Sequence, residues 1–136
     1  MAAEIQSKFE KVMIIDDNYI DLYITNRLII KNNFAKEVLP YDAAAEAIKY
    51  LQDNQENFSL LPQIIFTDIY MPGMSGFEFL EAYDSLNVAL KKYCKVFIIS
   101  STIDDKDIER SLLDKNSTAF QVKPITKEFL DGIVAF

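Results

Sequence analysis

The stretch Ile64-Ile65-Phe66-Thr67-Asp68-Ile69-Tyr70-Met71-Pro72-Gly73 decides the fold of this chain. An apolar run ends in a single carboxylate, Asp68, and a Pro-Gly turn follows at once. Short apolar runs that are bounded by turn residues are typical of buried strands. The pattern therefore predicts a strand that delivers Asp68 to the edge of a sheet.

Three other apolar runs also end in polar side chains. They are Val12–Ile15 before Asp16 and Asp17, Val96–Ile99 before Ser100 and Ser101, and Ala119–Val122 before Lys123 and Pro124. If these strands run parallel, their carboxyl ends share one edge of the sheet. We then expect acids, a hydroxyl and an amine to gather there, where parallel α/β sheets bind their ligands.

Helical patterns alternate with the apolar runs along the whole chain. We expect strands near Lys11–Asp16, Lys36–Tyr41, Gln63–Thr67, Lys95–Ser100 and Thr118–Val122. We expect helices over Tyr19–Lys31, Ala43–Asn54, Ser75–Leu90 and Asp104–Lys115, and from Thr126 onward. Continuous apolar strands that alternate with helices predict an α/β fold with a parallel sheet, and right-handed crossovers place helices on both faces.

Composition narrows the possible functions. The 136 residues suit one domain, and half of them are hydrophobic, so a core can form. The net charge of −7 argues against DNA as a partner, because phosphate backbones require clustered cations. The single cysteine, Cys94, excludes an intramolecular disulfide. With no signal-peptide pattern and no apolar run of about 20 residues, we expect a cytoplasmic protein without membrane insertion.

The chain has no histidine, so chemistry at the sheet edge falls to carboxylates, hydroxyls, lysine or a metal. Asp16, Asp17 and Asp68 would repel one another unless a hard divalent cation such as Mg²⁺ bound them. An aspartate beside such a metal can act as a nucleophile toward phosphorus. Lys123 would add a second positive charge, and Ser100 a hydrogen bond to a phosphoryl oxygen.

These residues carry a resemblance to the receiver domains of two-component response regulators. The matching motifs are Asp16-Asp17, Asp68 with Met71-Pro72-Gly73 and Gly76, Ser100-Ser101, and Lys123-Pro124. The resemblance implies a receiver domain over residues 11–136, preceded by an N-terminal extension of residues 1–10. It also implies a flavodoxin-like, doubly wound sheet of five parallel strands in the order 2-1-3-4-5, a receiver being one of the known examples of that order.

The resemblance further implies a metal and a phosphoacceptor. Asp68 would accept the phosphoryl group, with Mg²⁺ (or Mn²⁺) as cofactor. Asp17 would be the principal acidic metal ligand, and Asp16 would contribute mostly through water. The backbone carbonyl of Tyr70 would complete the protein's share of the metal shell. Tyr70 is bulkier than the residue often found there, and we hypothesise that its ring alters dephosphorylation.

The remaining motif residues would read the phosphoryl group. Ser100 fills the family's switch-hydroxyl position, and Ser101 fills a small-residue position that keeps the acceptor accessible. Lys123 would contact the phosphoryl group, and its bond to Pro124 is expected to be cis. Phe120 occupies the position of an aromatic that turns inward as the hydroxyl moves.

The implied function is a signalling switch in a phosphorelay. A sensor histidine kinase or a His-phosphotransfer protein would donate the phosphoryl group from a phosphohistidine. The domain would catalyse only its own phosphorylation and dephosphorylation, and so is not expected to be an enzyme in the ordinary sense. The sequence ends without an output domain, so we expect the surface of the fourth strand, fourth helix and fifth strand to act on a separate, unknown protein.

Other readings of the same residues stay open. Asp17 and Asn18 are both good N-cap residues, Phe120 suits simple core packing, and Lys123 suits a solvated turn. A phosphatase of the haloacid dehalogenase type would also use an aspartyl phosphate, but it usually has an acid where Tyr70 stands. A flavin-binding protein of similar fold would need a phosphate loop in place of Asp16 and Asp17. A receiver-like interaction module that is never phosphorylated is the third alternative.

Overall fold

A parallel sheet forms the centre of the computed structural model, which describes residues 6–102 and 104–134. Its strand order is β2-β1-β3-β4-β5, and every neighbouring pair is parallel. The strands are β1 (Phe9–Ile15), β2 (Ala35–Tyr41), β3 (Ile64–Thr67), β4 (Lys95–Ser100) and β5 (Ser117–Val122). The predicted doubly wound fold is confirmed, including its strand order.

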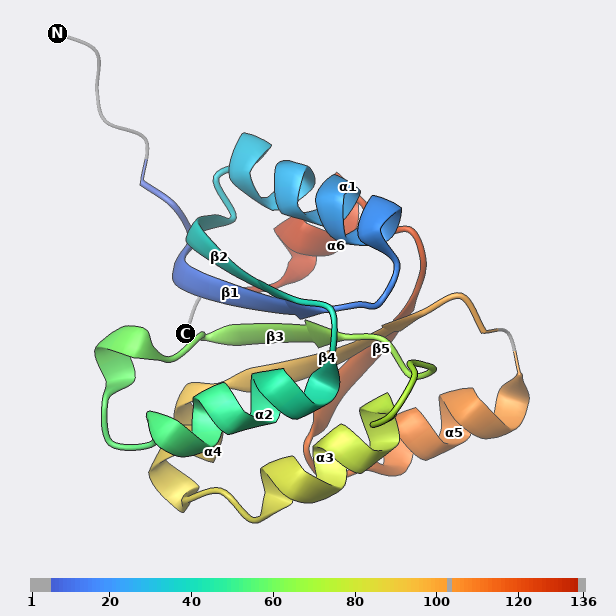
Figure 1. Ribbon diagram of the computed structural model, residues 1–136. Helices are drawn as coiled ribbons and strands as arrows, with labels where there is room; N and C mark the ends of the chain where they lie inside the picture. The colour runs from blue at the N-terminus through green and yellow to red at the C-terminus, as the bar shows by residue number, and fades with distance from the viewer. Residues whose placement is uncertain (1–5, 103, 135–136) are drawn as a thin grey trace, which may run out of the picture.

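Helices cover both faces of the sheet (Figure 1). One face carries α1 (Tyr19–Lys31) and α6 (Lys127–Gly132). The other carries α2 (Ala44–Asp53), α3 (Gly76–Asp84), α4 (Val88–Tyr93) and α5 (Asp105–Leu113), and a short 3₁₀ turn, η1 (Phe58–Leu60), precedes β3. None of these helices, across the part of the chain that the structure describes, is both long and apolar enough to cross a membrane.

The alternation of side chains along the strands divides the core in two. In β3 all four residues are buried, because both faces of the strand are covered. Ile64 and Phe66 pack with Ile29 of α1 and Leu130 of α6. Ile65 packs on the opposite side, in the cluster formed with α2 and α3. Two apolar layers thus fix β3, and with it the position of Asp68 at the end of the strand.

One predicted helix is wrong. The structure replaces a single helix over Ser75–Leu90 with two helices, α3 and α4. The Ser85 hydroxyl donates to the Ala82 carbonyl at 2.7 Å, and the Asn87 side chain accepts the N–H of Leu90 at 2.7 Å as the N-cap of α4. Serine and asparagine compete in this way for backbone hydrogen bonds, which ends one helix and starts another.

The start of the chain joins the fold earlier than expected. Strand β1 begins at Phe9, two positions before the predicted start, and the buried Phe9 ring packs edge-on against Phe34. The Lys8 ammonium donates to the carbonyls of Leu130 at 3.2 Å and Ile133 at 2.8 Å, at the end of α6. A cation at a helix C-terminus satisfies carbonyls that have no partner within the helix.

Candidate functional site

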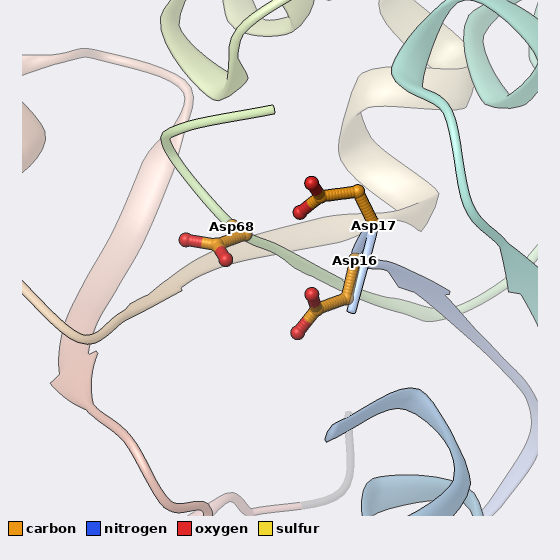
Figure 2. A group of neighbouring side chains, drawn as sticks. All are labelled: Asp16, Asp17 and Asp68. Carbon is orange, nitrogen blue, oxygen red and sulfur yellow. The ribbon is translucent and has the colours of Figure 1, made fainter. Parts of the chain in front are cut away.

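Three carboxylates meet at the carboxyl ends of β1 and β3 (Figure 2). Oxygens of Asp16, Asp17 and Asp68 lie within 4.8 Å of one another, so a single ion could contact all three. As whole residues, Asp16 is only 6% exposed and Asp68 only 8% exposed. Asp17 is exposed. The predicted grouping of the three acids is therefore present, and its open side is at Asp17.

Local hydrogen bonds orient the first two acids. One Asp16 oxygen, Oδ1, accepts the N–H of Asn18 at 2.9 Å. The N-cap of α1 is Asn18, whose side chain accepts the N–H groups of Ile20 and Asp21. Capping therefore falls to Asn18, and the Asp17 carboxylate extends toward the side of Asp68 in Figure 2. This division of roles answers the alternative that Asp17 serves as the helix cap.

The loop after β3 holds Asp68 tightly. Its Oδ1 accepts the N–H of the next residue, Ile69, at 2.7 Å. The N–H of Gly76 donates to the carbonyl of Ile69 at 2.7 Å, which folds the start of α3 back onto the strand end. A Cβ at position 76 would collide with the backbone carbonyl oxygen of Asp68, so only glycine fits there. Gly73, at φ 78°, makes the turn between them.

Lys123 is the centre of an ion-pair cluster. Its Nζ lies 2.8 Å from a carboxylate oxygen of Asp16, 2.8 Å from one of Asp68 and 2.9 Å from one of Asp21. Burial alone would lower the pKa of Lys123, but hydrogen bonds to the three carboxylates outweigh it and raise the pKa. Lys123 therefore stays charged, and the alternative of a solvated lysine is wrong.

Burial raises the pKa of the Asp16 carboxyl, despite the opposing effects of Lys123 and the Asn18 N–H. Nearby Asp68 acts in the same direction as burial. Three carboxylates, those of Asp16, Asp17 and Asp68, meet here beside a single ammonium, that of Lys123. Such a site favours a further cation.

Ser100 and Lys123 lie side by side at the ends of β4 and β5. Ser100 is buried, and its Oγ accepts the N–H of Thr102 at 3.3 Å. The N–H of Lys123 donates to the carbonyl of Ser100 at 2.9 Å, which sets the two residues side by side. Ser101, which follows, is exposed. The Lys123–Pro124 peptide bond is cis, as predicted.

Phe120 and Tyr70 differ in how firmly they are held. Phe120 is half-buried and packs against the core cluster on the α2 and α3 side of the sheet. This packing agrees both with a simple core residue and with a switch aromatic, so the switch role of Phe120 stays a prediction. The Tyr70 side chain is exposed, and its hydroxyl donates to Asp107 in the first turn of α5 at 2.6 Å. The carbonyl of Tyr70 stays a predicted metal ligand.

Two site residues were missed by sequence reasoning. Asp21 reaches Lys123 from α1, and Asp107 receives hydrogen bonds from Tyr70 and from the Thr102 hydroxyl at 3.1 Å. Both lie in the first turn of a helix, where an acid is explained by the helix dipole alone. The one available signal was that Asp21 follows Asp17 by one helical turn, which puts both near the same end of α1.

A cavity of about 290 Å³ opens beside the acids, between α1 and the sheet. Asp16, Asp21, Asp68 and Lys123 form its polar end. The rest of the wall is largely apolar and includes Ile14, Ile24, Phe66, Ile99, Pro124 and Ile125. The acids are thus reached from an open, partly apolar hollow, and not from within a closed core.

The donor set suits a hard cation. Carboxylate oxygens are the protein ligands that Mg²⁺ prefers, and Mg²⁺ keeps further positions for water and phosphate oxygens. Asp16, Asp17 and Asp68 supply such oxygens in one place, and no histidine or paired cysteine competes. Together with the strand order, this places the chain in the class of flavodoxin-like domains that carry an acidic pocket at the carboxyl ends of the strands.

Comparison with known proteins identifies the family. Residues 12–135 match the family model described as the response regulator receiver domain, and the chain belongs to this family. Receiver domains are parts of two-component signalling systems, bind Mg²⁺ in an acidic pocket and are generally not classical enzymes. The family match excludes the flavin-binding and haloacid dehalogenase alternatives.

Two relatives match most of the chain. The chain is 30% identical over 127 residues to hybrid signal transduction histidine kinase C of Dictyostelium discoideum, covering 91% of this chain and 10% of that protein. It is 31% identical over 138 residues to the two-component response regulator ARR8 of Arabidopsis thaliana, covering 92% of this chain and 59% of that protein. The chain therefore spans about a tenth of the length of the first relative and about three fifths of the length of the second.

Solved structures of response regulators have the same fold as this chain. A response regulator receiver protein from Dyadobacter fermentans DSM 18053 superposes with a TM-score of 0.78 at 30% identity, covering 89% of this chain and 91% of that one. A two-component response regulator from Cytophaga hutchinsonii gives a TM-score of 0.82 at 24% identity, covering 90% and 92%. The second likeness concerns the fold alone.

Proposed function

We propose that this receiver domain accepts a phosphoryl group on Asp68 from a partner phosphohistidine. Mg²⁺ (or Mn²⁺) would be held by Asp16, Asp17, Asp68 and the Tyr70 carbonyl. The observation that carries the proposal is the meeting of three carboxylates within 4.8 Å, with the Lys123 ammonium 2.8 Å from Asp68. Cations on both sides of one carboxylate suit transfer of a phosphoryl group to it.

In the transfer, an Asp68 carboxylate oxygen attacks phosphorus as the phosphorus–nitrogen bond of phosphohistidine breaks. The products are an aspartyl phosphate and a free histidine on the donor. A bound metal would offset the negative charge of the acids and of the incoming group. The Ile69 N–H fixes one Asp68 oxygen, and Lys123 pairs with the other. This hold orients the nucleophile before the donor arrives.

The new phosphoryl group would then change the surface. It brings roughly −1.5 to −2 charges and three acceptor oxygens, which attract the Ser100 hydroxyl. Ser100 now accepts the Thr102 N–H, so its movement disturbs the loop that leads into α5. Phe120 would turn inward as this happens. The resulting output surface comprises β4, α5 and β5, where α5 is the family's fourth helix.

The donor and the target would be separate proteins. A sensor histidine kinase or a His-phosphotransfer protein is the proposed donor, and an unknown protein is the target. The surface of α1 beside the acids supports a docked partner, since Tyr19, Ile20, Tyr23 and Ile24 are all exposed there. We place this exchange in the cytoplasm. The net charge of −7 speaks against DNA as the target.

Phosphorylation by acetyl phosphate with Mg²⁺, followed by intact-protein mass spectrometry, tests the proposal. The wild type should gain one phosphoryl group, and the Asp68→Ala variant should gain none. Asp53→Ala, which removes an exposed acid of α2, is the matched control and should be labelled like the wild type. Equal labelling of the Asp68→Ala variant, or no labelling of the wild type, would reject the assignment and favour a non-phosphorylated interaction module.

A further inference from the structure

Lys123 has one partner that the proposed chemistry does not use. Asp21, on the first turn of α1, places Oδ2 2.9 Å from Nζ of Lys123 across a sequence separation of 102 residues. Its side chain is 39% exposed, against 8% for Asp16 and 10% for Asp68. Asp21 lies outside the group of three acids that meet within 4.8 Å. It is thus a fourth carboxylate, directed at the lysine and not at the metal position.

The three partners of Lys123 would fare differently during phosphorylation. This step rests on the proposed function. Asp16 and Asp68 would turn from Lys123 toward a bound metal, and an oxygen of Asp68 would then carry the phosphoryl group. Metal binding would thus take carboxylates away from a lysine whose side chain is only 16% exposed, before the phosphoryl group offers it a new partner. An ammonium that loses its partners in a largely buried place is costly, unless another anion stays close.

We propose that Asp21 is a positioning residue that holds Lys123 while Asp16 and Asp68 turn to the metal and the phosphoryl group. Two opposite effects follow from one charge. Asp21 eases the entry of Mg²⁺, because Lys123 keeps a partner when Asp16 leaves it. Asp21 also slows phosphoryl transfer, because it partly neutralises the ammonium that would stabilise the incoming group and adds negative charge that repels it.

A purely structural role for Asp21 makes a different forecast. An acid in the first turn of a helix stabilises that helix through its dipole, whatever Lys123 does. Replacing it would then lower the stability of α1. The metal affinity and the transfer rate would both stay at their wild-type values. The two roles are therefore separated by measuring metal affinity and transfer rate independently.

The experiment compares wild type, Asp21→Asn and Asp21→Glu. Calorimetry gives the Mg²⁺ affinity without any donor, and acetyl phosphate at saturating Mg²⁺ gives the transfer rate. For Asp21→Asn we expect Mg²⁺ affinity to fall and the saturated rate to rise, each by about two- to fivefold, the range for a partly exposed ion pair. Asp21→Glu keeps the charge at a half-exposed helix position and should stay near the wild type.

Asp53→Asn is the control for charge alone, since it removes an equal charge from the exposed end of α2. It should change neither quantity. An Asp21→Asn variant that changes neither quantity, or only one of them, overturns the inference while the proposed function stands. Failure of the wild type to bind Mg²⁺ or to accept a phosphoryl group would instead overturn the proposed function and this inference with it.

Discussion

The hydroxyl of Tyr70 donates a hydrogen bond to the carboxylate of Asp107, with 2.6 Å between the oxygens. The bond ties the loop that follows Asp68 to the first turn of α5, 37 residues further along. The hydrogen bond to Asp107 raises the pKa of Tyr70. The Thr102 hydroxyl donates to the same Asp107 oxygen at 3.1 Å. Asp107 therefore joins both loops that border the acids.

The first prediction concerns the lifetime of the phosphorylated state. We propose that the Tyr70 ring shields the phosphoryl group, so in the Tyr70→Asn variant water should reach the acyl phosphate more easily. We expect dephosphorylation to be about fivefold faster, which corresponds to roughly 1 kcal/mol of barrier. The measurement is the decay of phosphorylated protein by mass spectrometry after the donor is removed.

Tyr70→Phe and Asp107→Asn are the matched variants for this experiment. Both weaken or remove the hydrogen bond between the two residues and keep an aromatic ring at position 70. Their lifetimes should agree with each other and fall between those of the wild type and Tyr70→Asn. A lifetime in Tyr70→Asn equal to that of the wild type would show that the ring does not shield the site.

The second prediction concerns packing beneath Asp68. Gly76→Ala forces a methyl group against the Asp68 carbonyl oxygen, so the loop or α3 must shift. We expect the free energy of unfolding to fall by about 1–3 kcal/mol, the usual cost of overpacking. Gly132→Ala is the control, because nothing lies within 4 Å of a Cβ there and its φ is not positive. It should be neutral or stabilise by about 0.5–1 kcal/mol.

Urea denaturation of both glycine variants checks this prediction. The phosphorylation rate of Gly76→Ala should fall as well, since the methyl group displaces the backbone that carries the acceptor. If both substitutions changed the stability by the same amount, the close contact between α3 and the Asp68 backbone would be refuted.

The third prediction concerns the donor. Ile20, which is 70% exposed on α1, is offered as part of the surface that a phosphohistidine protein covers. Ile20→Gln removes apolar area without adding charge and keeps a good helix former. We expect transfer from a phosphorylated His-phosphotransfer protein to slow by about tenfold, a typical loss of 1.4 kcal/mol at an interface.

The small donor provides the control for that variant. Acetyl phosphate needs no docking surface, so Ile20→Gln should react with it at the wild-type rate. Leu113→Gln, an equally polar change at an exposed position of α5, should leave transfer from the protein donor unchanged. Slower reaction with both donors would point to damage at the acids and away from docking.

The fourth prediction concerns Cys94 and alkaline pH. Burial raises the pKa of the Cys94 thiol from 9.0 to about 12. The unfolded chain therefore loses this proton first, and the stability contribution, complete below about pH 9, is lost as the pH rises toward 12. Urea midpoints should fall over this range, and alkylation of native Cys94 at pH 8 should be far slower than in urea.

The variant Cys94→Ala isolates this contribution. It should show a smaller fall of the urea midpoint above pH 9, while the buried Tyr83, whose pKa burial also raises, accounts for part of the remainder. A midpoint that rises with pH in the wild type would have the wrong sign for a buried thiol.

The sequence was sufficient for the sheet and for the acids, because both depend on local patterns. Each of β1, β3 and β4 contains an apolar run, and each run stops shortly before the polar residue that lies at the edge. The strand order was obtained by resemblance, since parallel runs of this kind do not reveal their neighbours. The placement of Asp16, Asp17 and Asp68 followed once that order was assumed.

Other features depended on pairs of residues that sequence spacing does not connect. The bonds of Lys123 to Asp21 and of Tyr70 to Asp107 join side chains from different elements, and only the folded chain brings them together. The break between α3 and α4 was missed because Leu86 and Leu90 continue the apolar spacing of the first helix, although Ser85 and Asn87 interrupt it. The sequence prediction followed the apolar periodicity, whereas the capping hydrogen bonds of Ser85 and Asn87 determine where one helix ends and the next begins.

The bonds from Lys8 to the carbonyls of Leu130 and Ile133 bring the entry to β1 beside the exit from α6. Strand β1 starts on the left of Figure 1 and delivers its acids on the right, so this corner lies away from the reactive edge. A domain whose first strand starts beside its last helix can be joined to other domains without rearranging its chemistry. The fold is thus compatible with fusion to other domains, in keeping with a relative in which the matched region is 10% of the length.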